Sequence, residues 1–426
     1  MSVFQRILDA ARRLSLFTLP APELRWGKAR RLEDRPAANG LPEVPPRLRS
    51  TRFMDAVLAF GVVLAIAGFS VAAIDRASSA LAGELILAGA ALAGLGVLCA
   101  FAARAQLAAD AEGEPAMRTQ PPDWGVGTLA GTFFGGVAGG AFFIAGLTDF
   151  FLTDSSLQPI ARHGYLVSLV AILLCLPCRI ADLGRLVRLR NFLIAFPPGS
   201  PASLGSWMLP LLAGFALTAT VQAFPDSLPL GARVVRGFTE WVPRRFVGLA
   251  GVLPAAFVAA GPGIALGGTF RPPWLQSRVL GALFFLSGVL SGLAAILGAM
   301  LVAAQMFGPV HTVLGRIGVW TGAIEMLFLL VLLALLGPWA SHLIGGRRAP
   351  AYWLGVAGFG VFLPVWLHQA NARSERLWRE LGSEQGWLIL GSLTGAFLLR
   401  WVVLSAGQEE RGPGRRPSRA AEGRSA

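Results

Sequence analysis

Residues 131–146 read GTFFGGVAGGAFFIAG, and this stretch decides the fold because it is apolar, uncharged and dense in glycine. Gly131, Gly135 and Gly139 recur at four-residue spacing, which places them along one face of a helix. Such a face lets a neighbouring helix approach closely, as packed membrane helices require. The stretch therefore predicts a membrane-spanning helix packed against other helices.

The rest of the sequence repeats this apolar pattern. Of its 426 residues, 54% are hydrophobic and only 14% are charged, a composition that excludes an ordinary globular enzyme. The apolar residues come in runs of about 20, enough to cross a hydrocarbon layer of about 30 Å. We predict an all-α fold, a polytopic integral membrane helix bundle with about ten transmembrane helices. The expected spans are residues 53–75, 80–108, 124–153, 160–183, 202–224, 246–268, 278–307, 317–337, 352–370 and 386–406.

Polar segments divide the protein into four parts. Residues 1–52 form a basic tail, in which apolar residues between 3 and 14 recur at helical spacing and predict an amphipathic helix on a membrane surface. Residues 53–108 form an N-terminal transmembrane hairpin, which the polar stretch 109–123 separates from an eight-helix core over 124–408. Residues 409–426 are rich in Arg, Gly, Pro and Ser and predict a disordered tail.

The net charge of +13 is concentrated in tails and connectors, so it orients a membrane protein rather than binding nucleic acid. With the N-terminus inside, 26 of the 37 Lys and Arg residues fall on the inner side, ten fall outside, and Arg400 lies within a span. This distribution predicts that both termini are cytoplasmic. The basic connector 225–245 is a local exception on the outer side.

Cysteine and histidine usage argues against a bound metal centre. Three cysteines cannot supply the four thiolates of a typical iron–sulfur cluster. Cys175 and Cys178 flank Pro177 in an apolar run, which favours a kinked, buried helix turn over a redox or metal pair. Histidines fall near span ends (His163, His368) or in connectors (His311, His342), so none forms a convincing pair of haem ligands. We expect no covalently or metal-bound cofactor.

The connector over residues 182–207, DLGRLVRLRNFLIAFPPGSPASLGSW, carries specific residues between two apolar spans. Arg185, Arg188 and Arg190 place three cations at a membrane edge, and the prolines after residue 196 prevent helix continuation. Trp207 suits the interfacial belt of a bilayer. By itself the stretch indicates either a basic loop with an aromatic anchor or an edge at which a partner docks.

Two ionisable residues lie well inside predicted spans, and such residues are functional candidates by default. Glu325 is near the middle of span 317–337, where a carboxylate is costly unless it is paired, and Arg400 is inside the last span. At about 1.5 Å of rise per residue they differ by roughly 9 Å in depth, so a direct pair requires the arginine to reach. We consider both as proton-path candidates, with a structural polar contact as the alternative.

Several stretches, taken in order, carry a resemblance to a known family. They are GGVAGGAFF (135–143), DLGR (182–185), NFL (191–193), SP and GSW within 200–207, GPGIALGGTFRPPW (261–274), FFLSGVLSGLAA (284–295) and LLRWVVLSAGQ (398–408). Together they resemble the NrfD (PsrC) family, the polytopic membrane subunits of polysulfide-reductase-type complexes. The resemblance covers about residues 124–408, and the N-terminal hairpin and basic tail lie outside its eight-helix pattern.

The resemblance implies a role in the bacterial cytoplasmic (inner) membrane. NrfD-like subunits carry no redox cofactor and exchange electrons between the quinone pool, as menaquinone or ubiquinone, and a ferredoxin-like 4Fe–4S iron–sulfur subunit. That subunit leads to a catalytic molybdopterin or multihaem subunit, and some complexes couple this transfer to proton movement. The protein would then be a non-catalytic or quinone-reacting subunit. A secondary transporter and a cofactor-free structural anchor remain the alternatives.

The resemblance also suggests where a quinone would bind. Some members carry an Asn and, one turn later, a His at the quinone, and the corresponding positions here hold Thr128 and Gly131. Our quinone-pocket candidates are Thr128, Asp182, Arg185 and Trp207, because a quinone needs an apolar slot with hydrogen-bond donors. The alternative pairs Asp182 with a neighbouring arginine, such as Arg185 or Arg179, as a structural clamp at the membrane edge.

Overall fold

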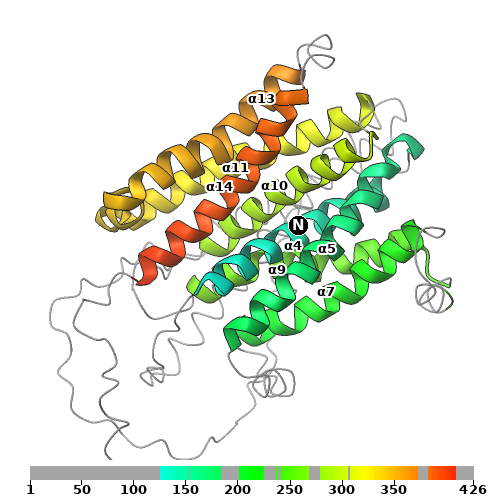
Figure 1. Cartoon of the computed structure of the whole chain (residues 1–426), viewed down its shortest axis with the longest axis horizontal. Helices are drawn as coiled ribbons and strands as arrows, with labels where there is room; N and C mark the ends of the chain where they lie inside the picture. The colour runs from blue at the N-terminus through cyan, green and yellow to red at the C-terminus, as the bar shows by residue number, and fades with distance from the viewer. Residues whose placement is uncertain are drawn as a thin grey trace, which may run out of the picture. The chain divides into compact units, whose positions relative to one another are not determined.

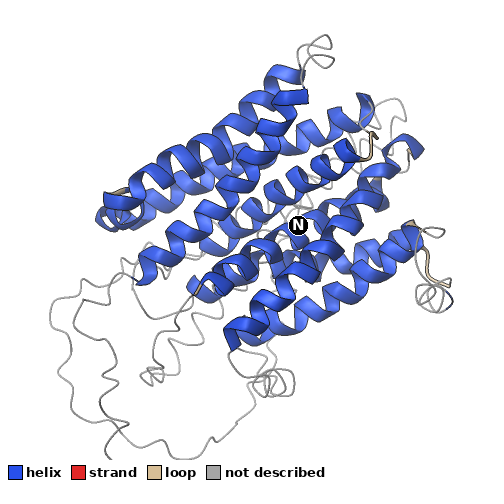
Figure 2. Ribbon diagram, in the orientation of Figure 1, coloured by secondary structure: helices blue, strands red, loops and turns tan. Residues whose placement is uncertain are grey.

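The computed structural model describes residues 125–152, 154–183, 201–224, 237, 241–267, 279–305, 308–372 and 382–408. Within these ranges every regular element is a helix, as Figure 2 shows, and this confirms the predicted all-α class. The predicted N-terminal tail, the hairpin over 53–108 and the C-terminal tail lie outside the described residues.

Eight long helical segments in the described part correspond to the eight predicted core spans. Seven of them are long and apolar enough to cross a membrane, and the eighth contains the shorter apolar segment Trp207–Ala223. Their bounds are α4 Val126–Phe151, α5 Gln158–Leu183, α7 Pro201–Ala223, α9 Arg244–Gly267, α10 Val279–Val302, α11 Gly308–Leu336, the π-helix η7 Ala351–Phe362 continued by α13 Leu363–Ala372, and α14 Gly382–Gln408. Short helices are η3 Ser155–Leu157, η5 Gly337–Ala340, α12 Ser341–Ile344 and η6 Gly346–Arg348.

The connection between α10 and α11 differs from its predicted limits. The spans were expected to end at 307 and to begin again at 317, but α10 ends at Val302 and α11 already begins at Gly308. A left-handed residue, Ala304 with φ of 52°, stops α10. The following N–H groups close a Schellman turn, in which Gln305 N donates to Met300 O at 3.0 Å and Ala304 N donates to Leu301 O at 3.1 Å.

Two histidines are consequently in helices rather than in the connectors where we expected them. His311 lies in the first turn of α11, and His342 lies in the short helix α12. Polar residues in the first turns of α11, including His311, Thr312 and Arg316, explain why hydropathy alone delayed the predicted start of this span.

Helices α4 and α10 form the centre of the bundle (Figure 1). About four-fifths or more of each span is buried, 83% for α4 and 94% for α10. Helix α4 packs mainly against α5, α9 and α10, whereas α14 packs against η7 and α10. The direction of successive helices alternates, so α4 begins at the same end of the bundle at which α5, α9 and α14 end. We call this end the Thr128 edge, and the opposite end the Asp149 edge.

The glycine-rich sequence allows α4 and α10 to touch backbone to backbone. A Cβ atom at Gly140 would overlap the carbonyl oxygen of Gly288, and one at Gly292 would overlap the backbone nitrogen of Ala141. Gly139 faces α9 in the same way, because an added Cβ would overlap the carbonyl oxygen of Ala255. The predicted close packing of this helix is therefore confirmed, and it fixes the polar groups of α4 relative to those of α10.

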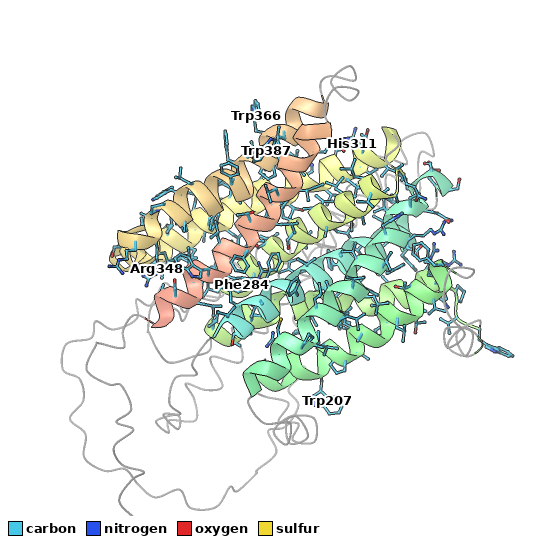
Figure 3. The ribbon with its side chains drawn as sticks, in the orientation of Figure 1. Trp207, Phe284, His311, Arg348, Trp366 and Trp387 are labelled. Carbon is cyan, nitrogen blue, oxygen red and sulfur yellow. The ribbon has the colours of Figure 1, made fainter. Side chains whose placement is uncertain are left out.

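Exposed tryptophans mark both ends of the bundle. Trp207, Trp353 and Trp401 lie near the Thr128 edge, and Trp241, Trp366 and Trp387 lie near the Asp149 edge. Figure 3 shows Trp207 on α7 and Trp366 and Trp387 at the opposite end. Tryptophan prefers the two interfaces of a bilayer, so this distribution fits helices that cross a membrane.

Candidate functional site

A buried arginine on α14 contacts α4 and α10 at the centre of the bundle. Arg400 belongs to α14, is 0% exposed, and extends to α4 and α10. Its Nε donates to the carbonyl oxygen of Thr132 at 3.1 Å, and its Nη1 donates to Ser287 Oγ at 3.2 Å and to Ala396 O at 2.7 Å. Hydrogen bonds from a charged donor are strong, so they hold the guanidinium in one place.

A glycine and a phenylalanine shape the space around this guanidinium. A Cβ atom at Gly136 would overlap Arg400 Nη2 and would lie 3.0 Å from Cζ, so the position must lack a side chain. The ring of Phe284 lies 5.3 Å from Arg400 Cζ, within the range of a cation–π contact. Figure 3 shows Phe284 on α10, beside α14.

Glu325 approaches the same group from α11. It is 3% exposed, and its carboxyl group interacts with the Ser287 hydroxyl and with the charge of Arg400. Asp149 and Arg244 form an ion pair within 4 Å among the described residues, but Glu325 and Arg400 do not. Ser287, which contacts both groups, therefore links Glu325 to Arg400. We call Arg400, Ser287 and Glu325 the core triad.

The core triad leaves two polar atoms without partners. Glu325 Oε2 and Arg400 Nη2 are buried and make no hydrogen bond. Buried polar atoms are nearly always satisfied in proteins, by other groups or by ordered water. An acceptor and a donor left open beside one hydroxyl can therefore bind water, and a carboxyl group in such a place can take up and release a proton.

A second polar group lies where α4 meets α5 at the Thr128 edge. Cys175 Sγ donates to the carbonyl oxygen of Gly131 at 3.2 Å and lies 3.7 Å from the Cβ position of Gly135. One turn further along α5, the side chain of Arg179 lies against Gly131, with Cδ at 3.3 Å and Nε at 3.4 Å from the Cβ position. This antiparallel register brings position 182 of α5 opposite position 128 of α4.

The four predicted quinone-pocket residues are described to different extents. Thr128 is half-buried on α4, at the edge that bears its name. Asp182 lies in the last turn of α5, opposite Thr128 by helix register, and Arg185 lies outside the described residues. Trp207 is 40% exposed and points away from the bundle in Figure 3. Their role in binding a quinone stays a prediction.

The two cysteines lie as the sequence predicted, inside a helix interrupted by a proline. Cys175 is buried, Cys178 is half-buried, and both are free thiols on α5, with Pro177 between them. Cys175 contacts α4 through its hydrogen bond to Gly131, so its described role is in packing.

A third polar group, absent from our predictions, joins three helices at the Asp149 edge. Arg244 of α9 donates to both carboxylate oxygens of Asp149 on α4, from Nε at 2.8 Å and from Nη2 at 2.7 Å. The hydroxyl of Tyr165 on α5 donates to the same carboxylate at 3.1 Å. Asp149 is a carboxylate inside a predicted span, and that signal could have identified it from the sequence.

Comparison with known proteins identifies the family. The family model described as "Polysulphide reductase, NrfD" matches residues 113–410, well over half of the protein. The chain belongs to the NrfD family. It is also 26% identical over 299 residues to the C subunit of polysulfide reductase from Wolinella succinogenes, a match that covers 65% of this protein and 91% of the relative. Family membership and the long apolar helices make it a multi-pass membrane subunit of a redox complex.

The NrfD sequence stretches converge on the core triad. Gly136 comes from the stretch 135–143, Phe284 and Ser287 come from 284–295, and Arg400 comes from 398–408. The last stretch also supplies Ser405, whose hydroxyl accepts a hydrogen bond from Arg348 Nε at 3.1 Å near the Thr128 edge. The order of these stretches predicted the family, but it does not reveal helix rotation, so the roles of Gly136, Phe284 and Ser287 were not predicted.

Proposed function

We propose that this NrfD subunit exchanges electrons between the membrane quinone pool and an iron–sulfur partner subunit docked at the Thr128 edge. In the oxidising direction a quinol releases two electrons and two protons. The electrons pass one at a time to the partner's clusters, and from there to a catalytic molybdopterin or multihaem subunit. The reverse direction consumes the same electrons and protons.

The observation that carries this proposal is the polar edge between α4 and α5 in a protein of the NrfD family. A quinone needs an apolar slot with a few donors, and α4 and α5 offer apolar helix surface with a hydroxyl at Thr128. Helix register brings position 182 opposite Thr128, so the acidic group and the hydroxyl come from adjoining helices. The basic connector beyond α5 would supply the docking surface for an acidic face of the partner.

Proton movement forms the second part of the proposal. The edge and the core triad share the backbone of α4, because Gly131 O accepts from Cys175 and the adjacent Thr132 O accepts from Arg400. Protons released at a quinol site therefore have a buried carboxyl group, Glu325, within the same helix cluster. We infer that Glu325 carries protons and that Arg400 and Ser287 hold its position.

Replacement of Asp182 or Arg185 by Ala tests the quinone site. Both variants should abolish quinol-linked electron transfer while the complex still assembles, because a quinone oxygen loses its polar partner. Arg245→Ala is the control, since it removes an exposed arginine at the Asp149 edge, away from the proposed docking surface. Full activity with quinol in both variants would remove these residues from the pocket.

Purification tests the function as a whole. A redox subunit should bring down an iron–sulfur protein whose clusters are reduced by added quinol. A transporter should purify alone and bind a solute, and a structural anchor should bring down the partner without binding quinone. Either of these last two outcomes would contradict electron exchange by this subunit.

A further inference from the structure

The span after α11 begins as a π-helix, η7, over 12 residues before it continues as the α-helix α13. At the end of η7, Leu363 N donates to Gly358 O, five residues earlier, whereas an α-helix joins residues four apart. π-helices are rare, are mostly limited to a single turn and are frequent at functional sites. A π-helix of this length inside a span therefore requires a physical explanation.

A proline directly after η7 brings the π form and an α form close in backbone hydrogen bonding. Pro364 has no N–H, so the α spacing would leave Gly360 O without its donor, and the π spacing leaves Phe359 O without its donor instead. Glycines at 355, 358 and 360 allow the backbone angles to change with little steric cost. The two forms therefore differ little in the number of backbone bonds that they make.

The packing of η7 against α14 depends on which form is present. A Cβ atom at Gly391 would come within 2.7 Å of Phe359 O, the carbonyl that the π spacing leaves free. The backbones of Gly360 and Gly395 also touch, because a Cβ on either residue would overlap the other. In an α form Phe359 O would turn inward to Leu363 N, and Gly360 would lie on a different face of the helix. Conversion of η7 would therefore displace α14.

The part of α14 that η7 contacts also holds Arg400. Ala396 follows Gly395 directly, and its carbonyl oxygen accepts a hydrogen bond from Arg400 Nη1 at 2.7 Å. The other partners of the guanidinium, Thr132 O and Ser287 Oγ, belong to α4 and α10, which are joined by direct backbone contact. A shift of α14 would therefore move Arg400 relative to a fixed pair of helices.

The same span contacts the helix that carries the acidic residue of the core triad. Figure 1 shows α13 between α11 and α14, and α13 packs against both. A Cβ atom at Gly322 of α11 would overlap the side chain of Val365 on α13, and Glu325 follows Gly322 by about one turn. The span formed by η7 and α13 therefore adjoins both charged residues of the triad.

We propose that η7 converts between the π form and an α form, and that this conversion makes and breaks the contact of Arg400 with Ser287. The inference rests on the proposed function, in which Glu325 carries protons, and adds the conformational step that regulates them. An isolated buried carboxylate is costly, so Glu325 takes up a proton when the guanidinium withdraws and releases it when the guanidinium returns.

A cysteine pair across η7 and α14 reports the form of η7. The Cβ position of Gly355 lies 3.6 Å from Leu398 Cβ, a separation that suits a disulfide. Leu398→Cys also removes the side-chain atoms that a Cβ at position 355 would overlap. In the α form the changed number of residues per turn rotates position 355 away from α14, so a bridge between Gly355→Cys and Leu398→Cys should form more slowly.

Two substitutions that disfavour the π form should slow this bridge. A Cβ at Gly358 would lie 3.1 Å from Trp353 O, a carbonyl of the preceding π turn, and a Cβ at Gly391 would lie 2.7 Å from Phe359 O. We expect Gly358→Ala and Gly391→Ala each to slow bridge formation about fivefold, because overpacking by one methyl group shifts such an equilibrium to this extent. Gly214→Ala is the control, since its Cβ meets nothing within 4 Å.

The bridged complex then tests the role of η7 in proton movement. In proteoliposomes it should still pass electrons from quinol to the iron–sulfur partner, but its proton uptake per electron should fall about twofold or more, because η7 is held in one form. Reduction of the bridge by a phosphine should restore the wild-type ratio. Leu398→Cys alone, treated with the same oxidant, is the control and should keep that ratio throughout.

The outcomes separate this inference from the function on which it rests. If neither glycine substitution slows the bridge, η7 has a single form and the inference is overturned. If the bridged complex keeps the wild-type ratio of protons to electrons, the form of η7 does not regulate proton movement, and the inference is overturned while electron exchange stands. If the wild-type complex takes up no protons although both substitutions slow the bridge, the proposed proton carriage fails and the conversion of η7 stands.

Discussion

Replacing Gly136 with Ala should destabilise the bundle by placing a methyl group where the guanidinium of Arg400 lies. The new Cβ would overlap Nη2 and would approach Cζ to 3.0 Å and Nε to 3.5 Å. Arg400 cannot move aside freely, because Nε and Nη1 bond to Thr132 O, Ser287 Oγ and Ala396 O at 3.1, 3.2 and 2.7 Å. The added methyl group therefore overpacks this site and also displaces the guanidinium from at least one of these hydrogen bonds.

The expected size follows from these two costs. Overpacking of a filled interior costs about 1–3 kcal/mol, and loss of one hydrogen bond from a charged donor costs about 1.5–3 kcal/mol. Alanine gains about 1 kcal/mol over glycine in helix propensity, which offsets part of the loss. We therefore expect Gly136→Ala to lower the free energy of unfolding by about 3 kcal/mol.

Thermal and SDS-induced unfolding of the purified protein in mild detergent measures this difference. Gly214→Ala is the control, because its Cβ meets nothing within 4 Å and it should be neutral or slightly stabilising. In an Arg400→Met background, Gly136→Ala should cost much less, because the overlapping guanidinium is gone. Equal stability of Gly136→Ala and Gly214→Ala would refute the position of the Arg400 guanidinium against Gly136.

Three further predictions test other parts of the molecule. Arg244→Ala should lower stability by about 3 kcal/mol, because it leaves the buried carboxylate of Asp149 without its cation, whereas Arg245→Ala on the same turn should change unfolding little. Ala304→Gly should raise the free energy of unfolding by about 0.5 kcal/mol. The left-handed conformation costs alanine about 1–2 kcal/mol, and glycine avoids this cost but loses part of the gain because its unfolded state is freer. A lower melting temperature would contradict the left-handed conformation of residue 304. Glu325→Gln should reduce proton uptake per electron in proteoliposomes, and an unchanged ratio would eliminate the proposed proton carrier.

A hydroxyl pair on α10 offers a sharper test of the core triad. Ser287 accepts a hydrogen bond from Arg400, whereas Ser291, one turn later, donates to Gly288 O of its own helix at 3.0 Å. Ser287→Ala should weaken proton coupling as Glu325→Gln does, and Ser291→Ala should not. The two variants remove the same atom from buried positions on the same helix, so the comparison isolates the contact with Arg400.

Hydropathy predicted the eight core helices because each must hide its backbone polar groups in an apolar layer, which gives a strong signal over about 20 residues. Hydropathy predicted the start of α11 too late, because Arg316 and the polar residues before it lower the average hydropathy, although they are tolerated near a helix end. The sequence signal is an average over a window, so it cannot resolve the turn at Ala304 that separates α10 from α11.

The candidate site was predicted less completely than the fold. Glu325 and Arg400 were recognised because ionisable residues are rare inside spans, and the predicted difference in depth agrees with the absence of a direct pair between these two described residues. Ser287 was missed because a serine in an apolar helix has many possible partners. Arg179 was considered only as a structural partner of Asp182, since the contact with Gly131 depends on the rotation of α5 against α4.

Electron exchange through this subunit is tested most directly by anaerobic addition of quinol to the purified complex, with reduction of the partner's iron–sulfur clusters followed by electron paramagnetic resonance. We predict rapid cluster reduction in the wild-type complex and a strongly slowed reaction in Asp182→Ala, with the clusters of both reducible by dithionite. Clusters that dithionite reduces but quinol does not, in the wild-type complex, would contradict electron exchange through this subunit.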